Sequence, residues 1–105
     1  MVDIPRRVTD LIGFYIRKLE ENHIPVQQAI LFGSYATGTF SEGSDIDLAI
    51  VSEAFRGSRV SERAMVRRIT LQISIDLEVI PFRPEDFVLD DPFVREIVET
   101  GRRFA

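Results

Sequence analysis

Cysteine is absent from this chain of 105 residues, which excludes disulfide bonds and thiolate metal sites and leaves the redox compartment open. His23 is the single histidine, and its place near the end of a predicted helix favours contact with the helix dipole over a site. No apolar run approaches the ~18 residues of a membrane span. The opening residues, MVDIPRR, lack the apolar core of a signal peptide. We therefore expect a cytoplasmic protein without a membrane partner.

Basic residues are fewer than acidic ones, and the formal net charge is −4. A negative chain of this kind argues against broad, non-specific binding to a nucleic-acid backbone, although a local basic patch remains compatible with phosphate binding. The sequence contains no repeat, low-complexity tract or linker, so residues 1–105 are expected to form a single domain. A domain this small has room for one sheet and a few helices. These residues leave no room for a second domain that recognises the substrate.

Periodic apolar residues divide the chain into alternating helices and strands. Spacings of three and four predict helices, and alternation of apolar with polar residues predicts strands. The helices are expected over residues 5–22, from Ser34, over 61–71 and from Asp91 to Gly101, and the strands over 26–32, 45–51 and 73–81. The last helix is expected to bury Phe93, Val94, Ile97 and Val98. This mixture indicates an α/β (α+β) fold, a small mixed β-sheet with helices packed mainly on one face.

Acidic side chains share one face of two of these strands. Asp45 and Asp47 lie two positions apart on the second strand, so both side chains point the same way. If the apolar rows of the second and third strands face the helices, Asp76 lies beside this pair, because neighbouring strands are about 4.8 Å apart. Glu78 shares that face but is not expected to be a ligand. The third strand alternates Ile73, Ile75, Leu77 and Val79 with Gln72, Ser74, Asp76 and Glu78.

These carboxylates predict a metal site. Three ionised carboxylates at close range repel one another unless a cation neutralises them. Ligands that are all oxygen suit Mg²⁺ or Mn²⁺ and leave positions open for substrate phosphates. A calcium-binding EF-hand is excluded, because the glycine that its loop requires, counted from Asp45, falls on Ile50. We expect Asp45, Asp47 and Asp76 to be catalytic, metal-binding residues.

Gly33 and Ser34 predict a phosphate-binding turn before this pair. Glycine after a strand lets the backbone approach a ligand closely, and the amides at the following helix start attract phosphate oxygens. Each part alone has an ordinary interpretation: Gly-Ser as a turn, Asp-x-Asp as a cap or a solvated edge, and Asp76 as an outward-facing strand residue. Their order along the chain is more specific, and it predicts phosphoryl or nucleotidyl transfer.

Residues 31–38 (LFGSYATG) followed by residues 44–48 (SDIDL) resemble the signature of the polymerase-beta-type nucleotidyltransferase superfamily. The chain length, residues 75–77 (IDL) and residues 97–102 (IVETGR) are similar to its minimal branch, the MNT domains. The resemblance covers nearly the whole chain and implies a small mixed sheet flanked by helices. It also implies two divalent metal ions and a nucleoside triphosphate. The metal ligands would be Asp45, Asp47 and Asp76, and the phosphate-binding residues Gly33, Ser34 and Ser44.

The resemblance further implies an antitoxin that silences a small helical HEPN-domain toxin. Some MNT antitoxins transfer AMP from ATP, in a Mg²⁺-dependent reaction, to a tyrosine hydroxyl of that toxin. The acceptor has to come from outside this short chain, as a partner protein in a homo- or hetero-oligomer or as a small molecule such as an antibiotic. Thr37 stands where the branch usually has arginine. This departure leaves a second interpretation open, a non-catalytic nucleotide-binding antitoxin that neutralises its partner by contact.

A group of arginines lies in and after the loop that follows the second predicted strand. These side chains are expected beside the proposed site, where they could bind a triphosphate or an acidic partner. A solvated helix face and loop is an equally good interpretation of the same residues. They are Arg56, Arg59, Arg63, Arg67 and Arg68.

Overall fold

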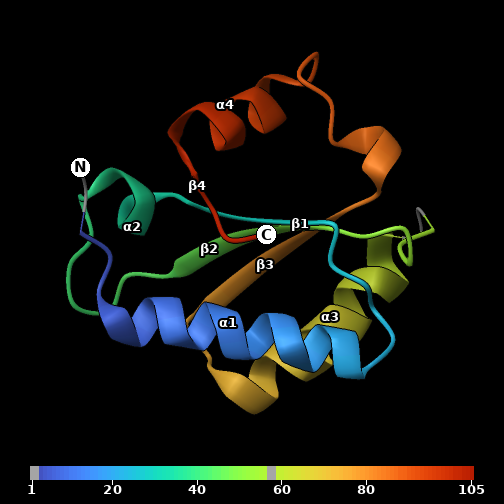
Figure 1. Cartoon of the computed structure of the whole chain (residues 1–105), viewed down its shortest axis with the longest axis horizontal. Helices are drawn as coiled ribbons and strands as arrows, with labels where there is room; N and C mark the ends of the chain where they lie inside the picture. The colour runs from blue at the N-terminus through green and yellow to red at the C-terminus, as the bar shows by residue number, and fades with distance from the viewer. Residues whose placement is uncertain (1–2, 57–58) are drawn as a thin grey trace.

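The computed structural model describes residues 3–56 and 59–105, without the side chain of Arg59. The described residues form a four-stranded sheet in the order β3-β2-β1-β4 (Figure 1). β1 pairs antiparallel with both β2 and β4, whereas β2 and β3 are parallel. The predicted mixed sheet is therefore confirmed. The strands are β1 (Gln28–Phe32), β2 (Ile46–Val51), β3 (Leu77–Phe82) and β4 (Arg102–Arg103).

Two long helices, α1 (Arg6–Glu21) and α3 (Arg59–Ile73), cover one face of the sheet (Figure 1). α1 buries one side chain every three or four positions, as its sequence predicts. The Tyr15 hydroxyl and the Thr70 hydroxyl, 3.0 Å apart, join the two helices inside this core. Burial raises the pKa of Tyr15 to about 12, so the phenol stays neutral. The main members of this layer are Val8, Ile12, Tyr15 and Leu19 of α1, Val66 and Ile69 of α3, and Leu31, Leu48 and Ile50 of the sheet.

A shorter helix, α4 (Pro92–Thr100), lies on the other face (Figure 1). Val94 and Ile97 are its buried residues, and they pack on Ala49 and Val51 of β2. The fold class is thus confirmed, with α1 and α3 together covering one face and α4 covering part of the other. The short α2 (Ser34–Thr37) follows β1, as predicted, and a 3₁₀ turn, Pro84–Asp86, follows β3.

The third strand begins later than the sequence predicts. α3 continues to Ile73, and β3 starts only at Leu77. Ile75 is 84% exposed in the connecting loop, so its predicted place in the core is wrong. The physical reason is that Ile73, the first residue of the predicted alternation, packs against the core from the end of a helix. Within β3, Leu77 is buried and Glu78 is exposed, as the sequence predicts for these two residues.

The last helix also differs in detail. Phe93 and Val98 were expected in the core but are 42% and 43% exposed, because Val94 and Ile97 form the stripe that faces the sheet. β4 is a strand that the sequence does not predict, since two residues are too few to show an alternation. A Cβ at Gly101 would lie 2.8 Å from the Leu31 carbonyl oxygen. Glycine therefore lets the chain pass close to β1 before β4 pairs with it.

None of the helices in the described part of the chain has the length and apolar character needed to cross a lipid bilayer.

Asp91 caps α4, as predicted: its Oδ1 accepts a hydrogen bond from the Phe93 amide at 2.9 Å. Replacing Asp91 by Ala should lower the free energy of unfolding by about 0.5–2 kcal/mol, because the first turn of α4 loses its cap. Urea unfolding followed by circular dichroism measures this difference. Asp90→Ala, at an exposed neighbouring position, is the matched control and should change stability little; equal losses in both variants would contradict the assigned cap.

Candidate functional site

Gly33 forms a turn between β1 and α2 that other residues fit poorly. Its φ of +76° lies in the region that L side chains rarely adopt. A Cβ at this position would also collide with the Asp47 carboxylate, whose Cγ would be 3.2 Å away. Both the backbone conformation and the space therefore require glycine here. The result is that the turn after β1 lies directly against an acidic side chain of β2.

The first turn of α2 begins at this glycine. The amides of Ala36 and Thr37 both donate to the Gly33 carbonyl at 3.1 Å, which leaves the preceding amides of Ser34 and Tyr35 outside the hydrogen bonds of the turn. Thr37 donates its hydroxyl to the same carbonyl at 3.2 Å. The Ser34 side chain is half-buried at the start of α2. These features are compatible with the phosphate-binding role predicted for Gly33 and Ser34.

Asp47 lies at the end of an otherwise apolar sheet face. Its partners across the sheet are Phe32 on β1 and Glu78 on β3. The next residue of β2 on the same face is Ala49, which is fully buried under α4. α4 thus covers the continuation of this face, and the Asp47 side chain, half-buried, marks the point where the cover ends.

The electrostatic surroundings of Asp47 disfavour its ionised form. Burial raises the pKa of the Asp47 carboxyl above its ordinary value of 3.8, and the negative charges of Asp45 and Glu78 raise it further. A carboxylate held among negative neighbours in this way is stabilised by a bound cation.

The other predicted acids lie nearby but are more exposed. Asp45 precedes β2, and Asp76 lies in the turn before β3. The Asp76 carbonyl accepts a hydrogen bond from the Ile46 amide at 2.8 Å, so the backbones of Asp45 and Asp76 meet at the same edge of the sheet. Within residues 3–56 and 59–105, no three acidic or histidine side chains converge closely enough to form a metal site. The three predicted ligands are therefore brought to one edge without being gathered around one point.

Glu78 is the residue whose position sequence reasoning underestimated. It was expected to share the face of Asp76 without taking part, yet it is Glu78 that pairs with Asp47 in the parallel register. The signal was present in the sequence, because Leu77 and Val79 flank Glu78 as Ile46 and Leu48 flank Asp47. The sequence alone leaves the register between the two strands open, so it does not show which acid lies beside Asp47.

Ser44, the remaining predicted phosphate-binding residue, has a role within its own loop. Its hydroxyl accepts a hydrogen bond from the Ser41 amide at 2.8 Å, and its amide donates to the Ser41 carbonyl at 3.1 Å. These bonds close the turn that leads into Asp45. Its predicted contact with phosphate stays a prediction.

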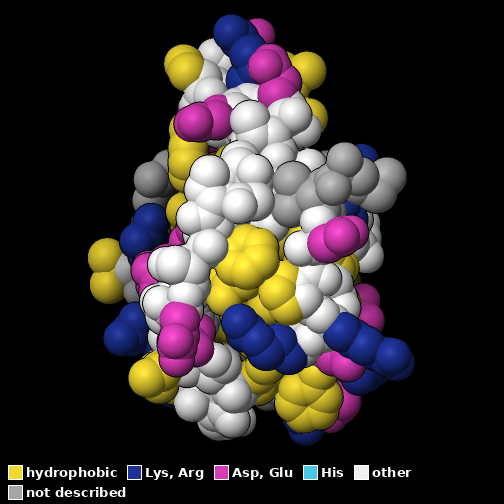
Figure 2. Space-filling model, turned by 90° about the vertical axis from the view of Figure 1, so that its left-hand side faces the viewer, with side chains coloured by type: hydrophobic (Ala, Val, Ile, Leu, Met, Phe, Trp, Pro, Cys, Tyr) yellow, Lys and Arg dark blue, Asp and Glu magenta, His cyan; other side chains and the backbone are white. Residues whose placement is uncertain are grey.

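An aromatic pair supports α2 from outside the site. The rings of Tyr35 and Phe40 are stacked with centroids 4.6 Å apart, and Arg7 of α1 donates to the Tyr35 hydroxyl at 3.1 Å. Figure 2 shows the side of the molecule where α2 and the start of α1 lie. Hydrophobic side chains reach the surface at the centre of this view, with lysine or arginine side chains directly below them. α1 therefore anchors the helix that carries Ser34.

The arginines after β2 do not form one cluster beside the site. Arg63 and Arg67 line a cavity of about 190 Å³ between α3 and β3, together with Glu78. Arg68 lines a different cavity, beside Asn22 at the end of α1. The side chain of Arg59 lies outside the described residues. Arg63 and Arg67 are consequently the members of the group that come near the site.

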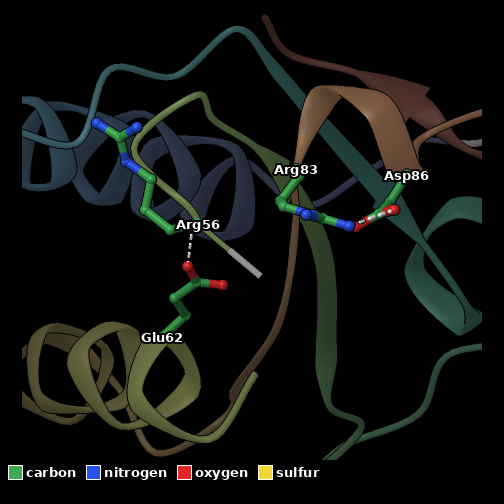
Figure 3. A network of polar contacts seen from close by, with 4 residues as sticks. All are labelled: Arg56, Glu62, Arg83 and Asp86. Atoms are coloured by element: carbon green, nitrogen blue, oxygen red, sulfur yellow. Dashed lines mark hydrogen bonds and ion pairs between the residues drawn. The ribbon is translucent and has the colours of Figure 1, made fainter. Parts of the chain in front are cut away.

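Arg56 belongs to a separate polar network (Figure 3). Its backbone amide donates to the Glu62 carboxylate, while its guanidinium points away from that carboxylate. Arg83 forms two hydrogen bonds with Asp86, at 2.7 and 3.0 Å. The bond from the Arg56 amide connects the loop after β2 with the start of α3, so the contact seen for this residue belongs to its backbone.

The sequence that forms this site matches a known protein family. The family model described as "Nucleotidyltransferase domain" matches residues 15–104, which include Gly33, Asp47 and Glu78. The chain belongs to the nucleotidyltransferase domain family. The match runs from Tyr15 in α1 beyond the end of β4, so the four strands and the helices α2, α3 and α4 fall within it.

One curated relative comes from Methanocaldococcus jannaschii and is named "Putative protein adenylyltransferase". It is 36% identical over 64 residues, which are 57% of this chain and 44% of the relative. The aligned part thus spans less than half the length of that relative.

Solved structures of low identity share the fold of this nucleotidyltransferase. A "putative nucleotidyltransferase" from Sulfolobus solfataricus matches with a TM-score of 0.67 and 22% identity, over 93% of this chain and 79% of that one. A toxin-antitoxin structure with AMP-PNP matches with a TM-score of 0.62 and 24% identity, over 90% and 70%. A toxin-antitoxin structure named MntA-HpeT matches with a TM-score of 0.61 and 22% identity, over 90% of this chain and 71% of that one.

The raised pKa of Asp47 gives a prediction for stability. In the folded state the carboxyl holds its proton to higher pH than in the unfolded chain, so unfolding is favoured progressively as pH rises from about 3.8. Asp47→Asn should therefore raise the free energy of unfolding at pH 7 in metal-free buffer, and this gain should disappear below the ordinary pKa. Urea unfolding across this pH range measures it. Asp90→Asn, an exposed acid far from the site in sequence, serves as the control, and a pH-independent difference between Asp47→Asn and wild type would contradict the assignment.

Proposed function

We propose that this nucleotidyltransferase transfers AMP from ATP to a hydroxyl group of a partner protein. The observation that carries the proposal is the close approach of Gly33 to Asp47. A glycine turn lies directly against a carboxylate whose neighbours, Asp45 and Glu78, are negatively charged. Phosphoryl-transfer sites need both features, a backbone that phosphates can approach and acidic oxygens that hold a cation beside them. The relative named for protein adenylyl transfer supports the choice of AMP and of a protein acceptor.

The donor set fits a divalent cation. The carboxylates of Asp45 and Asp47 offer oxygen ligands, and the pKa of Asp47 is raised by burial and then by the negative charges of Asp45 and Glu78. Mg²⁺ or Mn²⁺ prefers such oxygen ligands. We assign Asp45, Asp47 and Asp76 as the residues that would hold it, and the cation would supply the positive charge that neutralises the phosphates.

The remaining steps belong to the residues of the chain. The amides of Ser34 and Tyr35, together with the Ser34 hydroxyl, bind the phosphate oxygens beyond the α-phosphorus. That contact orients the bond to be broken. The acceptor hydroxyl oxygen forms a bond to the α-phosphorus while the bond to the bridging oxygen breaks, and pyrophosphate leaves. We propose that the Asp76 carboxylate receives the hydroxyl proton.

The partner that we propose is a small helical HEPN-type toxin, with this chain as its antitoxin. Two toxin-antitoxin structures share the fold of the chain, which supports a toxin as the partner. The acceptor hydroxyl then comes from the toxin. Modification of the toxin and contact with it are separate ways of silencing it.

A second candidate function is a non-catalytic antitoxin that binds nucleotide and neutralises its partner by contact. Thr37 favours this function, because its hydroxyl donates a hydrogen bond to the Gly33 carbonyl and lies 3.1 Å from the Thr39 hydroxyl. A neutral, engaged side chain at this position supplies no positive charge to a triphosphate. The two functions differ in whether inhibition of the partner requires the carboxylates of Asp45 and Asp47.

Incubating the partner with wild-type chain, ATP and Mg²⁺ should add the mass of one AMP to the partner. The partner is first isolated by co-purification from the native host, and intact-mass spectrometry reads the product. Asp45→Asn combined with Asp47→Asn should abolish the mass gain while the two proteins still associate. The absence of any mass gain with wild type, together with inhibition that survives in the double variant, would establish the contact mechanism.

Asp76 and Glu78 compete for the third position in the site, and matched variants separate them. If Asp76 is the ligand, Asp76→Asn should slow transfer about a hundredfold or more while ATP still binds, because one charge contact to the reacting centre is lost. Glu78→Gln should then retain most of the rate. Single-turnover transfer and ATP titration measure both variants. The reverse pattern would assign the role to Glu78, the residue that pairs with Asp47.

A further inference from the structure

A cavity of about 230 Å³ adjoins the turn at Gly33, between β1, α2 and α4. Its walls come from the end of β1 and from α4, and Thr37 of α2 completes them. It opens on the same sheet face as Asp47, because Phe32 and Asp47 are paired across β1 and β2. The residues that matter for its chemistry are Phe32, Gly33, Thr37, Phe93, Glu96 and Thr100.

The position of the cavity determines which part of a ligand reaches it. Gly33 lines the cavity and also contacts Asp47, so a ligand with its phosphates at this turn has its remaining part beside the opening. Pockets for whole drug-sized ligands measure about 300–1,000 Å³. A cavity of about 230 Å³ is smaller and suits one ring system of a nucleotide better than the whole molecule.

The walls combine aromatic rings with hydrogen-bond acceptors. The rings of Phe32 and Phe93 meet edge to face with centroids 5.8 Å apart, and Phe93 is 42% exposed although it is a large apolar residue. An exposed aromatic ring at a cavity offers a surface on which a planar base stacks. The same ring lies near Phe82, with centroids 6.4 Å apart, so Phe93 stands between the core beneath α4 and the cavity.

The polar groups of the cavity accept hydrogen bonds and have little capacity to donate them. Thr100 donates its hydroxyl to the Glu96 carbonyl at 2.7 Å, and Thr37 donates to the Gly33 carbonyl. Both hydroxyls therefore present lone pairs, and the Glu96 carboxylate is an acceptor when ionised. Among the described lining residues, Glu96 carries the one ionisable side chain. Its negative charge repels phosphates and attracts an amino group.

We propose that this cavity binds the nucleobase of the triphosphate and that Glu96 favours a base with an exocyclic amino group, such as adenine. The proposal rests on the proposed function, since it needs a nucleoside triphosphate whose phosphates lie at Gly33. Phe93 stacks on the base, and the Glu96 carboxylate accepts a hydrogen bond from its amino group. The phosphates stay at the turn because the negative charge of Glu96 opposes their entry.

Calorimetric titrations in Mg²⁺ with three probes test this assignment. The probes are ATP, purine riboside triphosphate, which lacks only the 6-amino group, and inorganic triphosphate. Wild type should bind ATP about tenfold or more tightly than purine riboside triphosphate, the effect of one hydrogen bond to a charged group. Glu96→Ala should reduce that ratio to near one, and Glu99→Ala, an exposed residue of the same helix outside the cavity lining, should preserve it.

Phe93→Ala provides an independent measurement. It should weaken both nucleotides to a similar extent, about fivefold to a hundredfold, and leave inorganic triphosphate unchanged, because only the stacking is lost. Circular dichroism shows whether Phe93→Ala is folded. If it is not, Glu96→Ala alone decides the test. Equal binding of ATP and purine riboside triphosphate by wild type, or an unchanged ratio in Glu96→Ala, overturns the base site while inorganic triphosphate still binds. Failure of wild type to bind any of the three probes overturns the proposed function and the base site together.

Discussion

Asp47 holds its carboxylate against the turn at Gly33, and much of the surrounding structure keeps these two residues in place. The antiparallel pairing of β1 and β2 sets Phe32 opposite Asp47, so the turn begins one residue beyond that pair. Any side chain at Gly33 would displace the carboxylate. The turn also needs a positive φ. Glycine satisfies both demands, and α2, anchored by the contact of Arg7 with Tyr35, fixes the direction in which the chain continues.

The two faces of the sheet differ in how completely helices cover them. α1 and α3 build the larger hydrophobic core on one face and stabilise the strands. On the other face α4 covers only part of the surface, and β4 holds the end of that helix against β1. This cover excludes water from the apolar neighbours of Asp47 and leaves the acidic edge accessible. Partial burial is the reason that the carboxyl resists ionisation, and complete burial would close the site to a ligand.

Much of the fold follows from the sequence, because long periodic patterns identify it. The apolar stripe of α1, the Asp91 cap and the placement of Gly33 before Asp47 were all predictable from local chemistry. Tertiary packing decided the rest. Ile75 looks like a strand residue in an alternating run, yet the run joins a helix end to a loop. The position of Glu78 beside Asp47 was not predicted either, because the register between β2 and β3 is decided by tertiary packing.

The parallel pairing of β2 and β3 has a consequence for how such a domain can diverge. Both strands begin at the acidic edge, and the chain returns between them through α3. The segment that leaves Val51 starts at the opposite edge, roughly 17 Å away at a rise of about 3.3 Å per residue. Insertions and substitutions there can reshape the outer surface without moving the carboxylates.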